Sequence, residues 1–202
     1  VDSQAPTQAT TIEGVYDDVA ADGSVLATAE KIGNGGYTND TTPQLRGTLS
    51  DVLNAGEKVV ILRDGAVIGE ATADGTGTGW SFDDAGLADG KTYIYTARVE
   101  DQAGNRRGIS SDYLVHVDTS EPSQTVVITT VWDDVAPGIG DVANNGTTND
   151  SQPELRGTLS SALAGNETLA VYRDNVKIGY ATVDGTGTNW KYVDTTGQLE
   201  NH

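Results

Sequence analysis

The hydrophobic and polar positions of this chain alternate mostly with a period of two. Residues 58–62 and 66–69 are two runs rich in β-branched residues, and the Asp64-Gly65 pair between them is typical of a two-residue hairpin turn. We expect this pair, like Asp174-Asn175 later in the chain, to adopt positive φ. Residues 92–100 continue the alternation, as expected for a half-buried strand. No segment shows a convincing helical period. The pattern therefore predicts an all-β chain.

Seven strands are expected in the first part of the chain. They are A at 9–15, B at 44–49, C at 58–62, D at 66–69, E at 80–82, F at 92–100 and G at 110–117. Seven short strands in about 100 residues are typical of an immunoglobulin-like β-sandwich. The chain has no cysteine, so such a sandwich relies on its apolar core alone.

The chain repeats itself. Residues 38–80 return as residues 148–190 without a gap, with 24 of 43 positions identical. The opening also returns, with Asp2 matched by Asp118, so one module is 116 residues long. This period is too long for a solenoid repeat and suits a whole domain. We therefore predict tandem seven-stranded immunoglobulin-like β-sandwiches, with module 1 at 1–117 and module 2 at 118–202.

Module 2 matches module 1 through Asp194 and then ends at His202 without the last two strands, F and G. These strands contribute much of the inner apolar face of such a sandwich. We expect His202 to mark proteolysis, disorder or an incomplete piece of a longer chain. If the chain stops there, its open edge should recruit strands from a neighbouring molecule.

Charge narrows the class of protein. The 30 acidic residues outnumber the 12 basic residues, for a net charge of −18. This balance argues against nucleic acid and anionic membrane surfaces as partners, and it favours a divalent cation among the carboxylates. No apolar run is long enough for a membrane span, which predicts a soluble internal fragment with no direct membrane insertion.

Several motifs occur together in order along the chain. They are Val-Asp-x-x-x-Pro at the module start, Asp-Asp-Val after strand A, Thr-Asn-Asp-x-x-Pro-x-Leu-x-Gly-Thr into strand B, Asp-Gly-Thr-Gly-x-x-Trp before strand E, and Asp101-Gln-Ala-Gly-Asn105 after strand F. Their combination resembles the bacterial immunoglobulin-like (BIg) repeats of giant type I-secreted RTX adhesins. The resemblance implies a Gram-negative cell-surface location, Ca²⁺ at the module junctions, and a distal domain outside this segment that binds a host-cell or surface ligand.

The residues give their own reason to expect calcium. Ca²⁺ prefers six to eight hard oxygen ligands, which Asp- and Asn-rich loops supply. The predicted metal ligands form three groups by their expected pole: Asp17, Asp18, Asp40 and Asp118 where module 1 ends; Asp2, Asp101 and Asn105 where it begins; and Asp133, Asp134 and Asp150 in module 2. Such residues commonly form turns instead. Their recurrence in both modules, together with the negative charge, favours metal.

Other motifs are given structural roles. The glycine-rich segments that begin at Asp74 and Asp184 lead into strands and not helices, so we interpret them as hairpin turns rather than phosphate loops. Trp80 and Trp190 are expected in the cores. The chain has two histidines at unmatched positions, and no nucleophile, base and acid set can be assembled. We predict that the chain is not an enzyme.

Two functions remain open. In the first, the modules are calcium-stiffened spacers whose partners are the neighbouring modules of the same chain. In the second, the modules themselves bind a glycan or a matrix protein. Two observations favour the first function. The carboxylates are expected at the poles, and no exposed apolar or aromatic run marks a partner surface on the predicted sheets.

Overall fold

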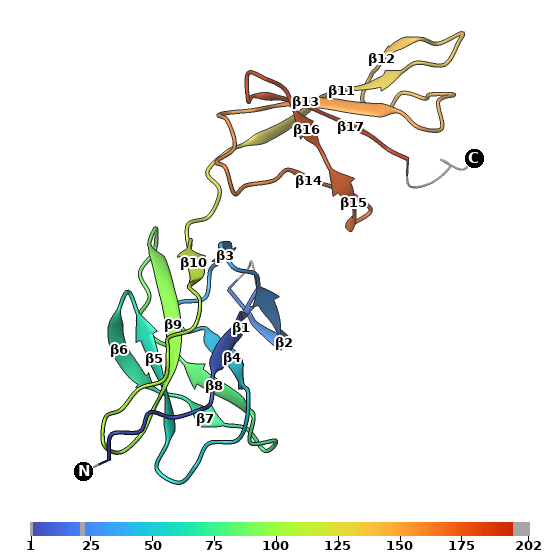
Figure 1. Ribbon diagram of the computed structural model, residues 1–202. Helices are drawn as coiled ribbons and strands as arrows, with labels where there is room; N and C mark the ends of the chain where they lie inside the picture. The colour runs from blue at the N-terminus through green and yellow to red at the C-terminus, as the bar shows by residue number, and fades with distance from the viewer. Residues whose placement is uncertain (1, 21–22, 196–202) are drawn as a thin grey trace. The chain divides into compact units, whose positions relative to one another are not determined.

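The computed structural model describes residues 2–20 and 23–195, and these residues form strands, turns and loops with no helix. The chain divides into two compact units, Val1–Ser120 (unit 1) and Glu121–His202 (unit 2), shown in Figure 1. The predicted module boundary follows residue 117. The all-β fold predicted from the alternation is confirmed.

Unit 1 contains two five-stranded sheets. The first has the order β2-β1-β4-β8-β7 and consists of β1 (Thr10–Val19), β2 (Val25–Ile32), β4 (Gln44–Leu49), β7 (Thr72–Ala73) and β8 (Gly79–Asp83). The second has the order β3-β10-β9-β5-β6 and consists of β3 (Gly36–Thr38), β5 (Lys58–Arg63), β6 (Ala66–Glu70), β9 (Thr92–Glu100) and β10 (Tyr113–Val117). This is the two-sheet arrangement of an immunoglobulin-like sandwich.

The strand pairing corrects the prediction in three respects. The described part of unit 1 has ten strands rather than seven, because β2 and β3 lie between strands A and B and β7 lies between strands D and E. Strand A extends to Val19. The hairpin partner of β5 is β6, which belongs to the same sheet as β9, whereas the role of strand D falls to the short β7 beside β8. Sequence alternation predicts a strand but not the sheet that it joins.

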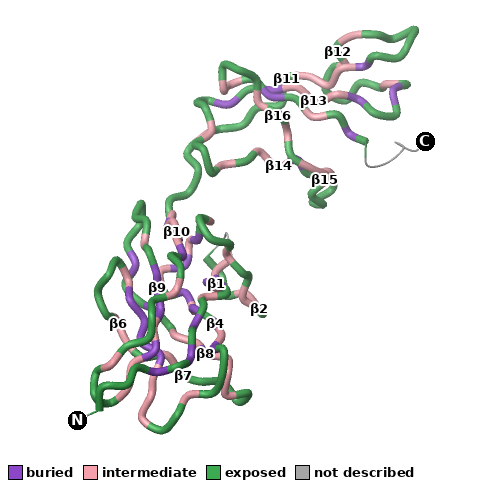
Figure 2. Tube along the Cα trace, in the orientation of Figure 1, coloured by how far each residue is buried: buried purple, intermediate pink, exposed green. Residues whose placement is uncertain are grey.

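The core of unit 1 lies between the two sheets (Figure 2). It contains Val15 and Leu45 from the first sheet and Ile61 and Tyr95 from the second, all with 0% exposure. Trp80 is 2% exposed in the same cluster, and its indole N–H donates to the Thr10 hydroxyl at 2.9 Å. The predicted core position of Trp80 is therefore confirmed, and its polar nitrogen is satisfied.

Unit 2 repeats the first sheet with the order β12-β11-β13-β17-β16. Its strands are β11 (Val126–Asp133), β12 (Gly140–Val142), β13 (Glu154–Leu159), β16 (Thr182–Val183) and β17 (Asn189–Val193). The second sheet is reduced to a hairpin of β14 (Ala170–Arg173) and β15 (Val176–Tyr180). Among residues 121–195, no strand takes the place of β9 or β10. The predicted incompleteness of this module is confirmed for the described residues.

Two local features are the same in both units. The hairpin turns adopt positive φ as predicted, with Asp64 at 52° and Gly65 at 79° in unit 1 and Asp174 at 51° in unit 2. A second feature is Gly47, where an added Cβ would lie 2.1 Å from the Thr11 carbonyl oxygen and 2.2 Å from the Trp80 ring. Only glycine permits this approach of strand and indole.

Candidate functional site

A group of acidic residues lies at the end of unit 1 where the linker leaves, and two of them, Asp17 and Asp40, are buried. We call this group the linker pole and define it by Asp17, Asp18, Thr38, Asp40, Asp89 and Asp118. The Thr38 hydroxyl donates to Asp17 Oδ2 at 2.6 Å and accepts the Asp40 backbone N–H at 3.0 Å. Asp17 is 6% exposed and Asp40 is 1% exposed. One threonine thus links the Asp17 carboxylate to the backbone of Asp40, two residues that are far apart in the sequence.

The remaining donors of this network come from the backbone and from the Thr42 hydroxyl, which donates to Asp40 Oδ1 at 3.1 Å. Asp17 Oδ1 accepts the N–H of Val19 at 2.8 Å, and Asp40 Oδ1 accepts the N–H of Thr42 at 2.7 Å. No basic side chain forms an ion pair with either carboxylate among the described residues. The two buried charges are therefore held by neutral donors.

Unit 2 repeats the bonds of Thr38 and of the backbone in this network. The Thr148 hydroxyl donates to Asp133 Oδ2 at 2.7 Å and accepts the Asp150 N–H at 2.9 Å. Asp133 is 2% exposed and Asp150 is 6% exposed. Bonds from Thr148 and the Val135 backbone hold the pKa of Asp133 below its usual value. The repeated sequence therefore builds a repeated, buried acidic pair.

The linker itself is held to unit 1 at the same pole. The backbone N–H of Asp118 donates to the Thr38 carbonyl at 2.9 Å, which continues the parallel pairing of β10 with β3. Asp89 then accepts the N–H of Thr119 at 2.7 Å and the hydroxyl of Ser120 at 2.9 Å. These bonds lower the pKa of Asp89. The first residues of the linker are thus part of the fold of unit 1.

The opposite end of unit 1 holds the second predicted group. Asn105 donates its side-chain amide to Asp101 Oδ2 at 2.8 Å and to the Asp2 carbonyl at 3.3 Å. Its backbone N–H donates to Asp101 Oδ1 at 2.8 Å. The Asn105 side chain is the main cause of the lowered pKa of Asp101. The structure therefore brings Asp2, Asp101 and Asn105 together, as expected for an end of the sandwich.

Two predicted site residues lie elsewhere than expected. Asp17 and Asp18 were placed in a loop after strand A, but both belong to β1. Successive residues of a strand point to opposite faces, so Asp17 is buried whereas Asp18 is exposed. In unit 2, Asp133 is the last residue of β11 and is buried, whereas Asp134 after it is exposed. Each predicted pair of neighbouring carboxylates is therefore split.

Sequence reasoning missed the threonines that organise both networks. Thr38 and Thr148 are identical in the repeat, so a search for hydroxyls repeated beside the Asp residues would have found them. It also missed Asp89, whose role depends on the position of the linker. No repeated signal marks that residue.

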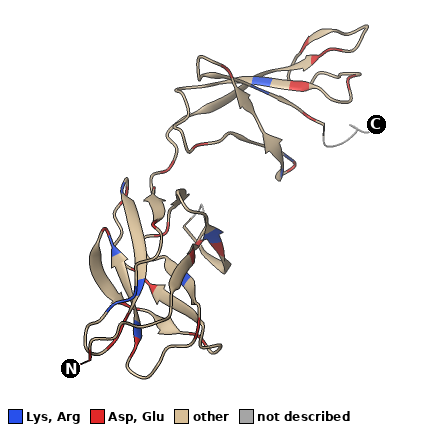
Figure 3. Ribbon diagram, in the orientation of Figure 1, with Lys and Arg blue, Asp and Glu red and all other residues tan. Residues whose placement is uncertain are grey.

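The oxygen donors at the linker pole have the chemistry that a hard cation prefers, namely carboxylates, a hydroxyl and backbone carbonyls. Among the described residues, however, no three His, Cys, Asp or Glu side chains are grouped so that they could hold a metal ion. Acidic residues occur in both units (Figure 3). Calcium stays a prediction at this point. The described residues also include no helix long and apolar enough to cross a membrane.

Comparisons with known proteins support the fold family for unit 1. Residues 21–119 match the profile of the bacterial Ig-like domain. Over these residues unit 1 is therefore similar to a bacterial Ig-like domain, and no comparison tests the RTX adhesin context. No curated protein matches the chain.

Among solved structures, the chain is similar to one described as "Crystal structure of Dpr2 Ig1-Ig2 in complex with DIP-Theta Ig1-Ig3". The identity is 10%, the match covers 81% of this chain and 82% of that chain, and the TM-score is 0.32. A likeness this low carries no argument about function. The assignment of an immunoglobulin-like sandwich rests on the strand order in unit 1.

Proposed function

We propose that this chain is a pair of spacer modules from a large Gram-negative cell-surface adhesin secreted by a type I system, and that Ca²⁺ at the module ends stiffens the array. The observation that carries the proposal is the acidic pair built twice, at Asp17 with Asp40 and at Asp133 with Asp150. In unit 1 this pair lies at the end from which the linker departs. The match to a bacterial Ig-like domain supports a surface or adhesion module.

The electrostatics of the pole support a cation there. The acidic residues of the pole add to the repulsion among the carboxylates of a chain with net charge −18. A bound Ca²⁺ would offset this repulsion and take oxygens from the exposed Asp18 and the half-buried Asp118. Ligand that binds only the folded state also raises stability by mass action.

A non-catalytic role agrees with the family match, because Ig-like domains are generally not enzymes. In the proposal the partners of each unit are further modules of the same chain, and a distal domain binds the host-cell or surface ligand. The alternative is that the modules themselves bind a glycan or matrix protein. Glycan and matrix-protein arrays with the two-unit chain separate the two functions, since a spacer should bind nothing on them.

The main test is a calcium titration of the two-unit chain with small-angle scattering and thermal unfolding. We expect calcium at about 10⁻⁴ to 10⁻³ M to raise the melting temperature. It should also increase the average dimension of the two-unit chain and narrow the spread of its dimensions. A chelator should reverse both changes. If the dimensions and the melting point are the same with calcium and with chelator, the spacer mechanism is wrong.

A matched pair of variants locates the effect. Asp18→Asn removes one negative charge from the linker pole at an exposed position, so it leaves the buried network intact. Glu13→Gln removes the same charge from an exposed position in the middle of β1. We expect Asp18→Asn to weaken the calcium response severalfold and Glu13→Gln to leave it unchanged. Equal responses would place the calcium elsewhere.

A further inference from the structure

The second sheet of unit 1 turns one side to the core and the other to solvent. Val59, Ile61 and Tyr95 belong to the core, so the residues that alternate with them on β5 and β9 point outward. By the same alternation, Leu114 and His116 of β10 point outward, because their neighbours on the strand are buried. We call the solvent side of this sheet the outer face.

An apolar stripe crosses all five strands of the outer face. Its members pair directly across neighbouring strands: Leu62 with Val67, Ile94 with Leu114, and Tyr37 with His116. Leu62 and Ile94 are diagonal neighbours, because Leu62 pairs with Thr96 on β9. The predicted absence of an apolar surface on the sheets is therefore wrong for this face, since strand pairing joins residues that are far apart in the sequence.

Three residues of the stripe are exposed, namely Tyr37 at 52%, Val67 at 57% and Ile94 at 39%. They are three of the six large apolar residues that are exposed in the described part of unit 1. Exposed apolar residues that gather on one face of a domain mark a contact with another molecule more often than scattered ones do.

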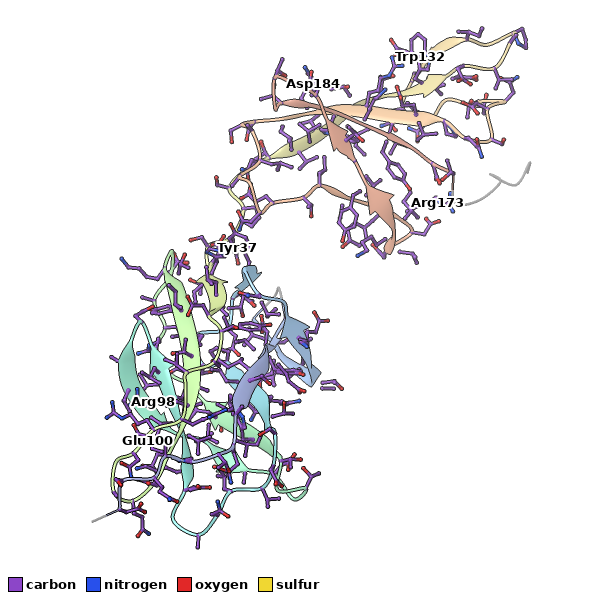
Figure 4. All side chains as sticks on the ribbon, viewed as in Figure 1. Tyr37, Arg98, Glu100, Trp132, Arg173 and Asp184 are labelled. Carbon is purple, nitrogen blue, oxygen red and sulfur yellow. The ribbon has the colours of Figure 1, made fainter. Side chains whose placement is uncertain are left out.

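The aromatic end of the stripe is held in place. The rings of Tyr37 and His116 are stacked, with their centroids 4.8 Å apart and their planes at 26°. The Thr92 hydroxyl and Nδ1 of His116 are 2.7 Å apart. Figure 4 labels Tyr37 on β3. Side chains that are already ordered lose little entropy when a partner covers them.

The charges of the outer face are nearly balanced. Lys58 forms an ion pair with Glu70, and Arg98 forms one with Glu100 at 2.7 Å (Figure 4). Arg106, after β9, adds a second basic partner to Glu100 at 2.8 Å. Unit 1 as a whole has 19 acidic and 8 basic residues, so its other surfaces are much more negative. Two copies of this acidic chain are therefore repelled least where their outer faces meet.

We propose that the outer face is a self-association surface, and that it packs against the same face of a second copy of this chain. The two copies are related by a two-fold axis, so each contributes the same residues. The two apolar stripes then cover each other, and a face with both signs of charge allows unlike charges to meet across the axis. Such a face does not select a strongly acidic or basic partner, which favours a second copy. The contact goes beyond the spacer function and needs no calcium.

The test uses the full 202-residue protein. Sedimentation and amide NMR over a range of protein concentrations should show monomers in equilibrium with dimers. We expect a Kd of about 10⁻⁴ M, because only three exposed large apolar residues of each copy lie on this face. The concentration-dependent shifts should lie on β3, β5, β6, β9 and β10. Monomers alone up to about 1 mM, or shifts confined to unit 2 or to the first sheet of unit 1, would overturn the proposal.

The repeat supplies a substitution that this fold accommodates. Val67→Lys copies Lys177, which occupies the matching position of unit 2. It should weaken self-association about tenfold or more, because two-fold pairing brings two new charges into the contact. Tyr37→Thr, which copies Thr147, has the same expected effect and serves as a second variant if Val67→Lys unfolds the unit.

The matched control places the same charge on the other sheet. Val25 is 78% exposed on β2, so Val25→Lys should leave self-association unchanged. If Val25→Lys weakens self-association as much as Val67→Lys does, or if neither variant weakens it, the outer face is not the contact.

Mixing the variant with the unchanged protein tests the two-fold pairing. In a face-to-face dimer each copy contributes Val67, so labelled Val67→Lys protein should bind the unchanged protein more weakly than the unchanged protein binds itself. If the two bind equally well, the outer face contacts some other surface of the second copy and the proposal is wrong.

Discussion

Among the described residues, unit 1 and unit 2 share most strands, turns and hydrogen bonds as far as β17, although β3 has no counterpart in unit 2, and only unit 1 has a closed core. The acidic pairs agree to within 0.1 Å in the threonine bonds, at 2.6 and 2.7 Å. The inner face differs, since among the described residues fifteen apolar residues are buried in unit 1 and three in unit 2. Local hydrogen bonding therefore follows from local sequence, whereas burial depends on β9 and β10, which follow much later in the chain.

The clearest consequence of this comparison concerns hydrogen exchange. Amides of β5 and β9 should exchange only when unit 1 unfolds, whereas those of β14 and β15 should exchange by local opening. Because global stability is about 5–15 kcal/mol, we expect a difference of about 1,000-fold or more. The internal control is the pairing of β1 with β4 in unit 1 and of β11 with β13 in unit 2. This pairing is complete in both units. Equal protection of β5 and β14 would mean that unit 2 closes its core in another way.

A second comparison concerns the buried ion pairs. Asp84 is 6% exposed beside Arg63, so Asp84→Asn should destabilise unit 1 by about 3 kcal/mol. Burial raises the pKa of Tyr95 far above its usual value, so its neutral hydroxyl stays a donor to Asp84. Asp194→Asn should cost about 1 kcal/mol or less, because Arg173 is 36% exposed and solvent screens the pair.

Urea unfolding followed by amide NMR measures both values, since it reports on each unit separately. Asp83→Asn is the control, because this neighbouring residue is exposed and asparagine keeps the acceptor for Gln44. Equal losses for Asp84→Asn and Asp194→Asn would contradict the difference in burial between the two units.

The smallest expected difference lies in two matching hairpin turns. Asp74 and Asp184 each accept bonds from a threonine two residues later, but Asp184 also accepts the side chain of Asn189 at 2.9 Å. The Thr186 hydroxyl and then Asn189 lower the pKa of Asp184 from 3.8 to about 2. The pKa of Asp74 is also lowered, chiefly by Thr76.

Because the pKa of Asp184 is lower in the folded state, its contribution to stability is present above pH 3.8 and is lost as the pH falls through 2. NMR titration of the carboxyl carbons should find a lower midpoint for Asp184 than for Asp74. Asn189→Gly, which copies Gly79 of unit 1, should raise the Asp184 midpoint toward that of Asp74. A midpoint unchanged by this substitution would show that Asn189 is not a cause.

The sequence predicted those elements whose signal is local. The strands at 44–49 and 92–100 have the predicted bounds, and the Asp64-Gly65 turn adopts the expected positive φ. β2 was missed because an edge strand with mostly exposed residues has little apolar alternation. The assignment of β6 failed because the sheet that a strand joins depends on distant partners.

The candidate site shows the same limit. Asp17 and Asp40 recur in the repeat as Asp133 and Asp150, which indicated a shared role. That Asp17 is buried and Asp18 exposed depends on how far β1 extends. Asp89 gave no signal, because its role arises only when the end of β10 lies beside it. Repetition identifies the residues of such a site, and topology decides their contacts.

The parallel pairing of β3 with β10 has a mechanical consequence. β10 lies between β3 and β9, and the Asp118 bond to Thr38 extends the first of these ladders into the linker. A tensile force on residue 118 along the axis of β10 would load both rows of hydrogen bonds in shear, so they would have to break together. We therefore expect unit 1 to unfold in single-molecule stretching as one high-force event, and Asp89 to keep the linker residues 119 and 120 attached until the load rises.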